Sequence, residues 1–381
     1  MPRSVFPEGD HRCTRLPRLQ VASDELLHLD LVRFVASIGI VFLHSHLFFY
    51  SAEQRAAVHQ VTGGLALFVD LFFVISGFII ASIYHDRVGH VKDIGRFMQR
   101  RIGRLVPLHW LTLALSIGLW AILASFAHGA HQPDFSPICI INNALLLHAF
   151  VTCGQFQFNA VTWSIGAEMV MYLLFPIIAL LGRRWRSAPL VMGIAILGTL
   201  FIQTYGIDLD GGPYMWTALH PVLRALPTFL IGAGLFYCPV IARKVPSPQL
   251  CLGLALATLI AAMLTGMPGP LQLLLISAVA LSAIASDMKR RRGPFIRRIA
   301  PLGQLTYSIY MWHTLFILAL MNAVGDKILH NRTGPMMLLT LLCYGAILAW
   351  SYISFSFIET PARRWVDGLF GGHRRLHGVP G

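Results

Sequence analysis

The sequence predicts an all-α, polytopic membrane protein, and three observations predict this class. Hydrophobic residues make up 56% of the 381-residue chain and charged residues only 12%, whereas a soluble domain carries roughly 25% charge. The 24 Phe and 8 Trp residues exclude a disordered chain. The apolar stretches are long and do not alternate, which excludes the short alternating strands of an outer-membrane barrel.

Ten apolar ranges reach or approach the roughly 20 residues that a spanning helix needs. In chain order they are 29–50, 61–84, 105–127, 161–181, 189–204, 219–237, 249–266, 269–285, 303–324 and 336–358. We therefore expect about ten transmembrane helices. A further range, 138–151, is too short for a normal span, and we expect a re-entrant or interfacial segment on the outer face.

The distribution of positive charge orients these spans. With both termini in the cytoplasm, 25 of the 30 Lys and Arg residues fall on the inner side, as the positive-inside rule requires. This distribution accounts for the net charge of +13 without nucleic-acid binding. The predicted organisation is a basic tail (1–27), a transmembrane domain (28–365) and a second basic tail (366–381).

Ionisable side chains inside the spans indicate a functional site, because each is costly in hydrocarbon. They are Arg33, His44, Asp70, Glu168, Arg224 and His313. By position along their spans, His44, Asp70, Glu168 and Arg224 share one depth, so we expect them to meet in a polar cavity. The alternatives are a snorkelling role for Arg33, a helix–helix hydrogen bond for His44 and a purely structural ion-pair network.

A His–carboxylate pair facing a hydroxyl is suited to general-base chemistry. We therefore expect His44 to act as a base that Glu168 orients, with direct transfer rather than a covalent intermediate, although the sequence does not exclude the latter. Arg100, Arg101 and Arg104 precede the third span at helical spacing and suit binding of phosphates. The alternative for these arginines is contact with inner-leaflet lipid.

The six cysteines form no C-x-x-C pair, and we expect no metal site. Only Cys139 and Cys153 share the outer side in this topology, where disulfides persist. They flank the short segment 138–151 and are expected either to form a bridge or to be two unrelated thiols.

Several short motifs resemble the membrane-bound acyltransferase 3 family, which O-acylates bacterial glycans. LVRFVASIGIVFLH resembles its R-x10-H motif, with Arg33 and His44, and VDLFFVISGFII resembles F-F-x-x-S-G-F, with Asp70 upstream. RRIGRLVPLHW resembles the basic R-x-x-R element, and TWSIGAEMVMYLLFP resembles W-S-x-x-x-E-x-x-x-Y, with Trp163, Glu168 and Tyr172. LTYSIYMWH resembles Y-S-x-Y-x-x-H, with Tyr310 and His313, and FIETPARRW resembles the closing E-x-P-x-R.

The resemblance implies a ten-helix enzyme of the bacterial inner membrane that takes an acyl group, commonly acetyl, from cytoplasmic acyl-CoA. The expected acceptor is a sugar hydroxyl of an extracytoplasmic or lipid-linked glycan, such as an exopolysaccharide repeat unit. Acyl-CoA would be a co-substrate, with no permanently bound cofactor, and homo-oligomerisation is left open. The expected residues are His44, Glu168 and Asp70 for catalysis, Arg33, Arg100, Arg101 and Arg104 for the donor, and Trp163, Arg224, Tyr310 and His313 for substrate.

Two rival functions use the same residue types. A proton-coupled secondary transporter or glycan flippase also needs intramembrane His, Asp, Glu and Arg, but many transporters show internal repeats and none is visible here. A non-catalytic assembly subunit is the second rival. Acyl transfer by the purified protein separates the enzyme from the transporter, and loss of acylation in a His44→Ala variant that still assembles argues against the scaffold.

Overall fold

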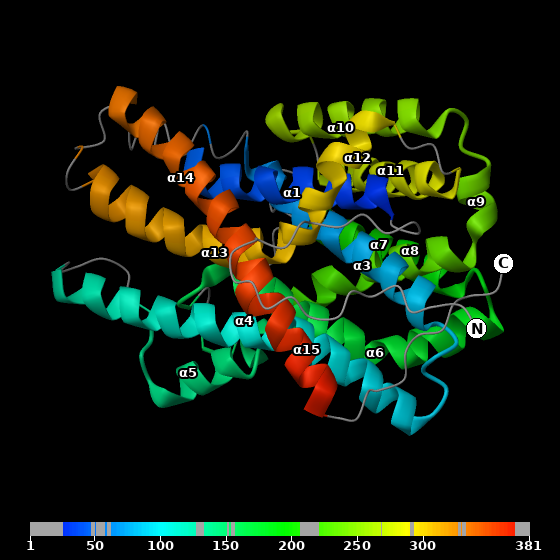
Figure 1. The fold of residues 1–381 in the computed structure, drawn as a ribbon. Coiled ribbons are helices and arrows are strands. Elements are labelled where there is room, and N and C mark those ends of the chain that lie inside the picture. The colour runs from blue at the N-terminus through cyan, green and yellow to red at the C-terminus, as the bar shows by residue number, and fades with distance from the viewer. Residues whose placement is uncertain are drawn as a thin grey trace, which may run out of the picture.

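The structure, a computed structural model, describes residues 26–46, 50, 58, 62–126, 133–150, 152–153, 157–205, 221–267, 269–289, 293–326, 329 and 333–369. Within these ranges the fold is built from helices (Figure 1). The all-α prediction is confirmed for this part of the chain. Most residues of the two predicted tails lie outside the described part of the chain.

Each of the ten apolar ranges contains a helix. The long helices are α1 (Leu27–Ser45), α3 (Phe68–Tyr84), α4 (Val91–Phe126), α6 (Trp163–Arg184), α7 (Ala188–Tyr205), α8 (Pro221–Tyr237), α10 (Pro248–Leu264), α11 (Gly269–Met288), α13 (Thr306–Phe316) and α14 (Thr333–Ser354). Short helices are α5 (Pro137–Ala144), α9 (Pro239–Arg243), α12 (Pro294–Ile299) and α15 (Thr360–Leu369). Tighter 3-10 turns are η2 (Gly63–Leu67), η3 (Leu147–Phe150), η4 (Ala160–Thr162) and η6 (Ala300–Leu305), and wider π-helical stretches are η7 (Ile317–Asp326) and η8 (Phe355–Glu359).

Six helical stretches of the described part are long and apolar enough to cross a membrane. They are Leu27–Ser45, Gly63–Tyr84, Val91–Ala124, Ala160–Arg184, Leu271–Met288 and Gly334–Leu369, and three shorter apolar helices cover Ala188–Phe201, Pro221–Tyr237 and Pro248–Leu264. The chain is therefore a multi-pass membrane protein. Ten crossings with both termini in the cytoplasm stay a prediction.

Helix α4 is longer than the third apolar range predicts. It runs from Val91 to Phe126, which at 1.5 Å per residue is ~54 Å, well beyond the ~30 Å hydrocarbon core of a bilayer. The basic segment that precedes the apolar range is therefore the first part of the same helix. Because successive residues on one helix point about 100° apart, its arginines face different surroundings.

Helices α3 and α8 pack at very short range through two glycines. A Cβ atom on Gly77 would lie 2.1 Å from the Phe229 carbonyl oxygen, and one on Gly232 would lie 1.9 Å from the Val74 carbonyl oxygen. Only the missing side chains allow the two backbones to approach so closely, as is common between membrane helices. This approach fixes the rotation of α3 against α8, and so it fixes which of their polar side chains face each other.

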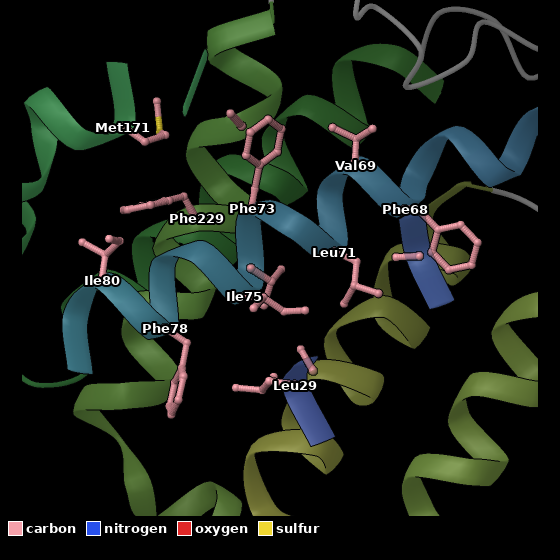
Figure 2. Packing of buried hydrophobic residues seen from close by; sticks show 14 of the residues in the cluster. Leu29, Phe68, Val69, Leu71, Phe73, Ile75, Phe78, Ile80, Met171 and Phe229 are labelled. Atoms are coloured by element: carbon pink, nitrogen blue, oxygen red, sulfur yellow. The ribbon is translucent and has the colours of Figure 1, made fainter. Parts of the chain in front are cut away.

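Helix α3 forms the centre of the apolar core. Figure 2 shows Phe68, Phe73, Phe78, Leu71 and Ile75 leaving it in several directions. All of these side chains are at most 8% exposed. A largely apolar helix buries most of its surface, and α3 accordingly packs between α8, α1 and α11.

A buried carboxylate from another helix caps the start of α1, which has no side-chain cap of its own. The Asp287 carboxylate of α11 accepts the backbone N–H groups of His28 (3.0 Å) and Leu29 (3.1 Å) and pairs with His28 Nδ1 (2.7 Å). Unpaired N–H groups at a helix start need such an acceptor. This contact ties the beginning of α1 to the end of α11.

The short segment between α4 and α6 carries the predicted disulfide, one of the two alternatives for its cysteines. Cys139 of α5 is bonded to Cys153, with their Cα atoms 5.5 Å apart. His148 of η3 belongs to the same segment, and its Nε2 donates to Thr162 Oγ1 (3.0 Å), which itself donates to the Asn159 carbonyl. Burial lowers the pKa of His148 to about 4, so the ring is neutral near pH 7.

Candidate active site

A cavity with about 740 Å³ of atom-free space, including its open part, lies among α1, α3, α4, α6 and α13. Its apolar lining comes mainly from α3, with Leu105 of α4 and Ile165 of α6. Its polar lining consists of Arg33, Ser76, Arg104, Ser164, Glu168, Tyr172, Thr306, Tyr307 and Tyr310. An apolar cavity with a few convergent polar groups is the usual form of a small-molecule site.

Glu168 is held in the cavity wall by two hydroxyl groups. Ser76 Oγ donates to its Oε1 (2.7 Å), and the Tyr172 hydroxyl, one helical turn further along α6, donates to the same oxygen. Its Oε2 has no hydrogen-bond partner among the described residues. The carboxylate is thus oriented by the protein and keeps one oxygen for a ligand.

Arg33 and Arg104 bring positive charge to the same cavity. Arg33 Nη1 pairs with Asp30 Oδ1 on the preceding turn of α1 (3.1 Å). Arg104 lies near enough to interact electrostatically with Glu168 and Glu359. In the described part of the chain its guanidinium has no hydrogen-bond or ion-pair partner of its own. Arg104 therefore keeps donors free for an anionic ligand.

The three predicted phosphate ligands on α4 have different surroundings. Arg100 is exposed, whereas Arg101 is buried and does not line the cavity. The Arg101 guanidinium lies over the rings of Tyr84 (5.2 Å), Phe97 (5.9 Å) and Tyr172 (5.7 Å), and its Nη2 donates to the Tyr84 hydroxyl (3.1 Å). Of the three, only Arg104 lines the cavity, and phosphate binding by Arg100 and Arg101 stays a prediction.

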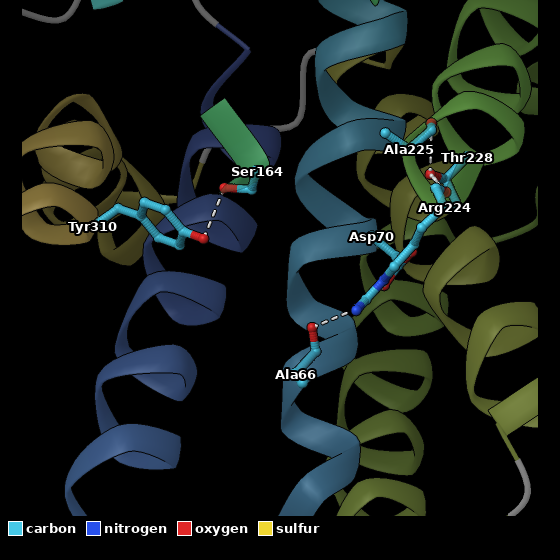
Figure 3. A network of polar contacts seen from close by, with 7 residues as sticks. All are labelled: Ala66, Asp70, Ser164, Arg224, Ala225, Thr228 and Tyr310. Carbon is cyan, nitrogen blue, oxygen red and sulfur yellow. Dashed lines mark hydrogen bonds and ion pairs between the residues drawn. The ribbon is translucent and has the colours of Figure 1, made fainter. Parts of the chain in front are cut away.

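Asp70 and Arg224 form a buried ion pair away from the cavity lining (Figure 3). Arg224 Nη2 lies 2.5 Å from Asp70 Oδ2, its Nε lies 3.0 Å and 3.2 Å from the two carboxylate oxygens, and its Nη2 also donates to the Ala66 carbonyl (2.9 Å). Arg224 further lies over the Trp163 ring at 5.4 Å. Asp70 therefore links α3 to α8. Of the four residues expected to meet, Asp70 and Arg224 do so, whereas Glu168 and His44 have other partners.

His44 meets another histidine instead of the expected carboxylate. His44 Nδ1 lies 3.0 Å from His313 Nε2, and the two rings stack with centroids 5.1 Å apart. Among the described residues neither ring forms an ion pair. The pairing of His44 with Glu168 was therefore wrong, because Glu168 turns toward Ser76 and Tyr172.

Tyr310 lies between the cavity and the histidine pair. It lines the cavity, its hydroxyl is 2.8 Å from Ser164 Oγ (Figure 3), and its ring centroid is 5.7 Å from that of His313. The predicted substrate residue Trp163 packs beside Phe73 at the edge of the same region, with ring centroids 6.5 Å apart. The cavity and the histidine pair are thus neighbours that share Tyr310.

The sequence reasoning did not assign site roles to Ser76, Tyr172, Ser308 or Glu359. Ser76 and Tyr172 fix Glu168, and Ser308 Oγ donates to the buried carboxylate of Glu359 (3.1 Å). All four lie in the motifs quoted above. The spacing of Glu168 and Tyr172, four residues apart on one helix, was a signal for contact between them.

These features define a class: a multi-pass helical membrane protein whose interior holds a ligand cavity with arginines, an oriented carboxylate and a neighbouring histidine pair. Residues 26–355 match the model of a family described as an acyltransferase domain. Because the match covers most of the chain, the chain belongs to the membrane-bound acyltransferase 3 family. It is an acyltransferase.

Three curated relatives cover most of this chain or a large part of it. The exopolysaccharide production protein ExoZ of Rhizobium meliloti is 28% identical over 85% of this chain and 99% of its own length. The putative membrane-bound transacylase BcsY of Komagataeibacter xylinus is 26% identical over 64% of each chain. The O-acetyltransferase OatA of Staphylococcus aureus is 24% identical over 88% of this chain and 57% of its own length. No solved structure matches the chain.

Proposed function

We propose that this protein is a transmembrane O-acyltransferase of the bacterial inner membrane. It moves an acyl group, in the first instance acetyl, from cytoplasmic acyl-CoA to a sugar hydroxyl of an extracytoplasmic or lipid-linked glycan. The observation that carries the proposal is a cavity lined by the unpaired Arg104, the oriented Glu168 and Tyr310, with the His44–His313 pair next to Tyr310.

The donor would bind with its phosphates at Arg104 and Arg33, because guanidinium groups bind phosphate through charge-assisted hydrogen bonds. Both arginines lie toward the predicted cytoplasmic ends of their helices. Arg33 and His44 are eleven residues apart on α1, a rise of ~16 Å, which an extended pantetheine arm can bridge. The apolar walls suit that arm, and Glu168 Oε2 can accept a hydrogen bond from one of its amides.

The transfer step needs a base for the acceptor hydroxyl. In the proposal, His44 takes the hydroxyl proton while the oxygen attacks the thioester carbonyl carbon. A C–O bond forms, the C–S bond breaks, and the thiolate of CoA leaves and receives the proton from His44. Atoms and charge balance without a metal or a further cofactor in the proposed step.

The names of the relatives support the choice of acceptor and acyl group. ExoZ is named for exopolysaccharide production and OatA for O-acetyl transfer. An exopolysaccharide repeat unit, free or lipid-linked, is therefore the acceptor that we propose. The bilayer is the third partner, because the two substrates reach the site from opposite sides.

Mass spectrometry of cell-surface polysaccharide tests the proposal in cells. Deletion of the gene should remove an acyl substituent, shown as a loss of the acetyl mass increment on a repeat-unit sugar, and the intact gene should restore it. A gene that carries His44→Ala should not restore the substituent. The control His85→Ala should restore it, because His85 directly follows the end of α3 and does not line the cavity. Loss of the polysaccharide itself from the cell surface, rather than of its acyl group, would favour the flippase instead.

A further inference from the structure

The partner of His44 is another imidazole, and the contacts of that ring determine where the proton on each neutral ring sits. His313 Nδ1 lies 2.8 Å from the Tyr310 carbonyl oxygen and 3.3 Å from that of Ile309. A carbonyl oxygen only accepts hydrogen bonds, so Nδ1 of His313 carries the proton. In the neutral ring its Nε2 is then an acceptor, and this nitrogen faces His44.

The position of the proton on His44 follows from that of His313. Its Nδ1 lies 3.0 Å from the acceptor Nε2 of His313, so Nδ1 of His44 must carry the proton and donate it. Its Nε2 is left without a proton. Among the described residues Nε2 has no hydrogen-bond partner, and His44 is exposed rather than buried. A general base needs this arrangement: an unprotonated nitrogen with access to the substrate.

We propose that His313 is a positioning residue that holds His44 in the Nδ1–H tautomer and so presents Nε2 as the base. The inference rests on the proposed function, because only a transfer reaction needs the base. It replaces the substrate-binding role that we expected for His313 from the sequence. Without a partner, an imidazole distributes its proton between both nitrogens, and the Nε2–H form cannot accept the hydroxyl proton.

The pair also accommodates the charge that forms during the reaction. When His44 Nε2 takes the hydroxyl proton, the imidazolium keeps donating Nδ1–H to the neutral His313. The proton returns from Nε2 to the departing thiolate, so no net charge remains on the pair. His313 cannot release its own Nδ1 proton, because the carbonyl of Tyr310 is only an acceptor. It therefore orients and supports the base without taking part in proton transfer.

Tyr310 connects this pair to the donor cavity. Its carbonyl sets the His313 ring, while its side chain lines the cavity and is hydrogen-bonded to Ser164 (2.8 Å). These contacts lie within a single turn of α13. The orientation of the base is thus built on the same helical turn as part of the cavity wall.

Two substitutions of His313 separate positioning from packing. His313→Gln can place Oε1 as an acceptor near the former Nε2 position, whereas His313→Leu fills the space with no acceptor. We expect His313→Leu to lower kcat about 10²–10⁴-fold, the range for losing a base or its correct tautomer, with the KM for acetyl-CoA unchanged. We expect the kcat of His313→Gln to be at least tenfold higher than the kcat of His313→Leu.

A direct readout of the tautomer completes the test. Full-length protein with ¹⁵N-labelled histidine in lipid nanodiscs is studied by NMR, and His44→Gln identifies the His44 signals. The wild type should show a protonated Nδ1 and an unprotonated Nε2 on His44, and His313→Leu should show both tautomers. A protonated Nε2 in the wild type, or an unchanged kcat in His313→Leu, would overturn the inference.

The two proposals fail in distinguishable ways. A wild type without any acyl transfer would refute the proposed function, while the NMR result would still report the tautomer of His44. Transfer that proceeds normally in His313→Leu would refute the positioning role alone.

Discussion

At the scale of single residues, the roles of the α4 arginines follow from which side of one helix each occupies. Arg104 faces the cavity with free donors, Arg101 is enclosed by three aromatic rings, and Arg100 is exposed. Identical side chains one and three residues apart are thus a proposed ligand, a packing group and a surface charge. The sequence could show that they are helically spaced but not which of them the cavity would take.

Arg104→Ala should raise the KM for acyl-CoA by about 10–100-fold, because hydrogen bonds to charged groups contribute about 1.5–3 kcal/mol. Initial rates against acetyl-CoA concentration measure this effect, and added salt should raise the wild-type KM as well. Arg100→Ala is the matched control and should leave the KM within twofold. If Arg104→Ala left the KM for acyl-CoA as unchanged as Arg100→Ala, both arginines would act only as inner-leaflet anchors.

The two acids also have different surroundings: Asp70 is held in an ion pair, whereas Glu168 is open to the cavity. Asp70→Asn leaves Arg224 buried without its counter-charge, and breaking such a pair costs about 3–5 kcal/mol. We expect a clearly lower midpoint of thermal unfolding in detergent and partial recovery in Asp70→Leu with Arg224→Met. Glu168→Gln should keep the wild-type midpoint and lose activity. Full stability of Asp70→Asn would contradict the structural role.

At the scale of elements, sequence reasoning located the helices well and their rotations poorly. The ten apolar ranges all contain helices, and the short outer range is a separate element that ends in a disulfide. Depth along a span is readable from the sequence because each residue rises by a fixed amount. The direction that a side chain faces depends on how the helices pack. The residues expected in one polar cluster therefore lie in three separate clusters in the structure.

Gly232→Ala tests the packing that brings Asp70 to Arg224. The added Cβ would meet the Val74 carbonyl oxygen at 1.9 Å, which forces α8 away from α3. Expression of folded protein and its thermal midpoint should fall, and activity should fall with them. Gly253→Ala on α10 is the control, because its Cβ would have no neighbour within 4 Å, and replacing helical glycine by alanine is otherwise favourable by about 1 kcal/mol. If both variants behaved alike, the close approach of α3 and α8 would be wrong.

The Cys139–Cys153 bridge should stabilise the outer segment by roughly 3 kcal/mol, the chain-entropy value for a loop of about 15 residues. Hydrogen exchange of residues 137–150 should therefore speed up in Cys153→Ser, with exchange in α3 unchanged. Alkylation with and without reductant, followed by peptide mapping, checks the bridge itself. Cys251→Ser is the control and should change neither result. Two alkylated thiols at 139 and 153 without reductant would refute the bridge.

At the scale of the whole molecule, the helices place the cavity with its two arginines next to the histidine pair, with Tyr310 in contact with both. Motifs far apart in the sequence supply these parts: α1 and α13 give the histidine pair, α3 and α6 give the oriented carboxylate, and α4 gives the free arginine. The family resemblance identified most of these residues in advance. It could not give their partners, because contacts such as His44 with His313 join residues 269 positions apart.

The central claim is that the acyl group crosses the membrane interior while CoA stays on the cytoplasmic side. The most direct measurement uses proteoliposomes of known orientation, with radiolabelled acetyl-CoA outside, on the cytoplasmic face, and a sugar acceptor sealed inside. We predict labelled acceptor inside the vesicles with wild-type protein and with His85→Ala, and none with His44→Ala. Labelled acceptor only when both substrates are on the same side, or equal labelling with His44→Ala, would contradict the account.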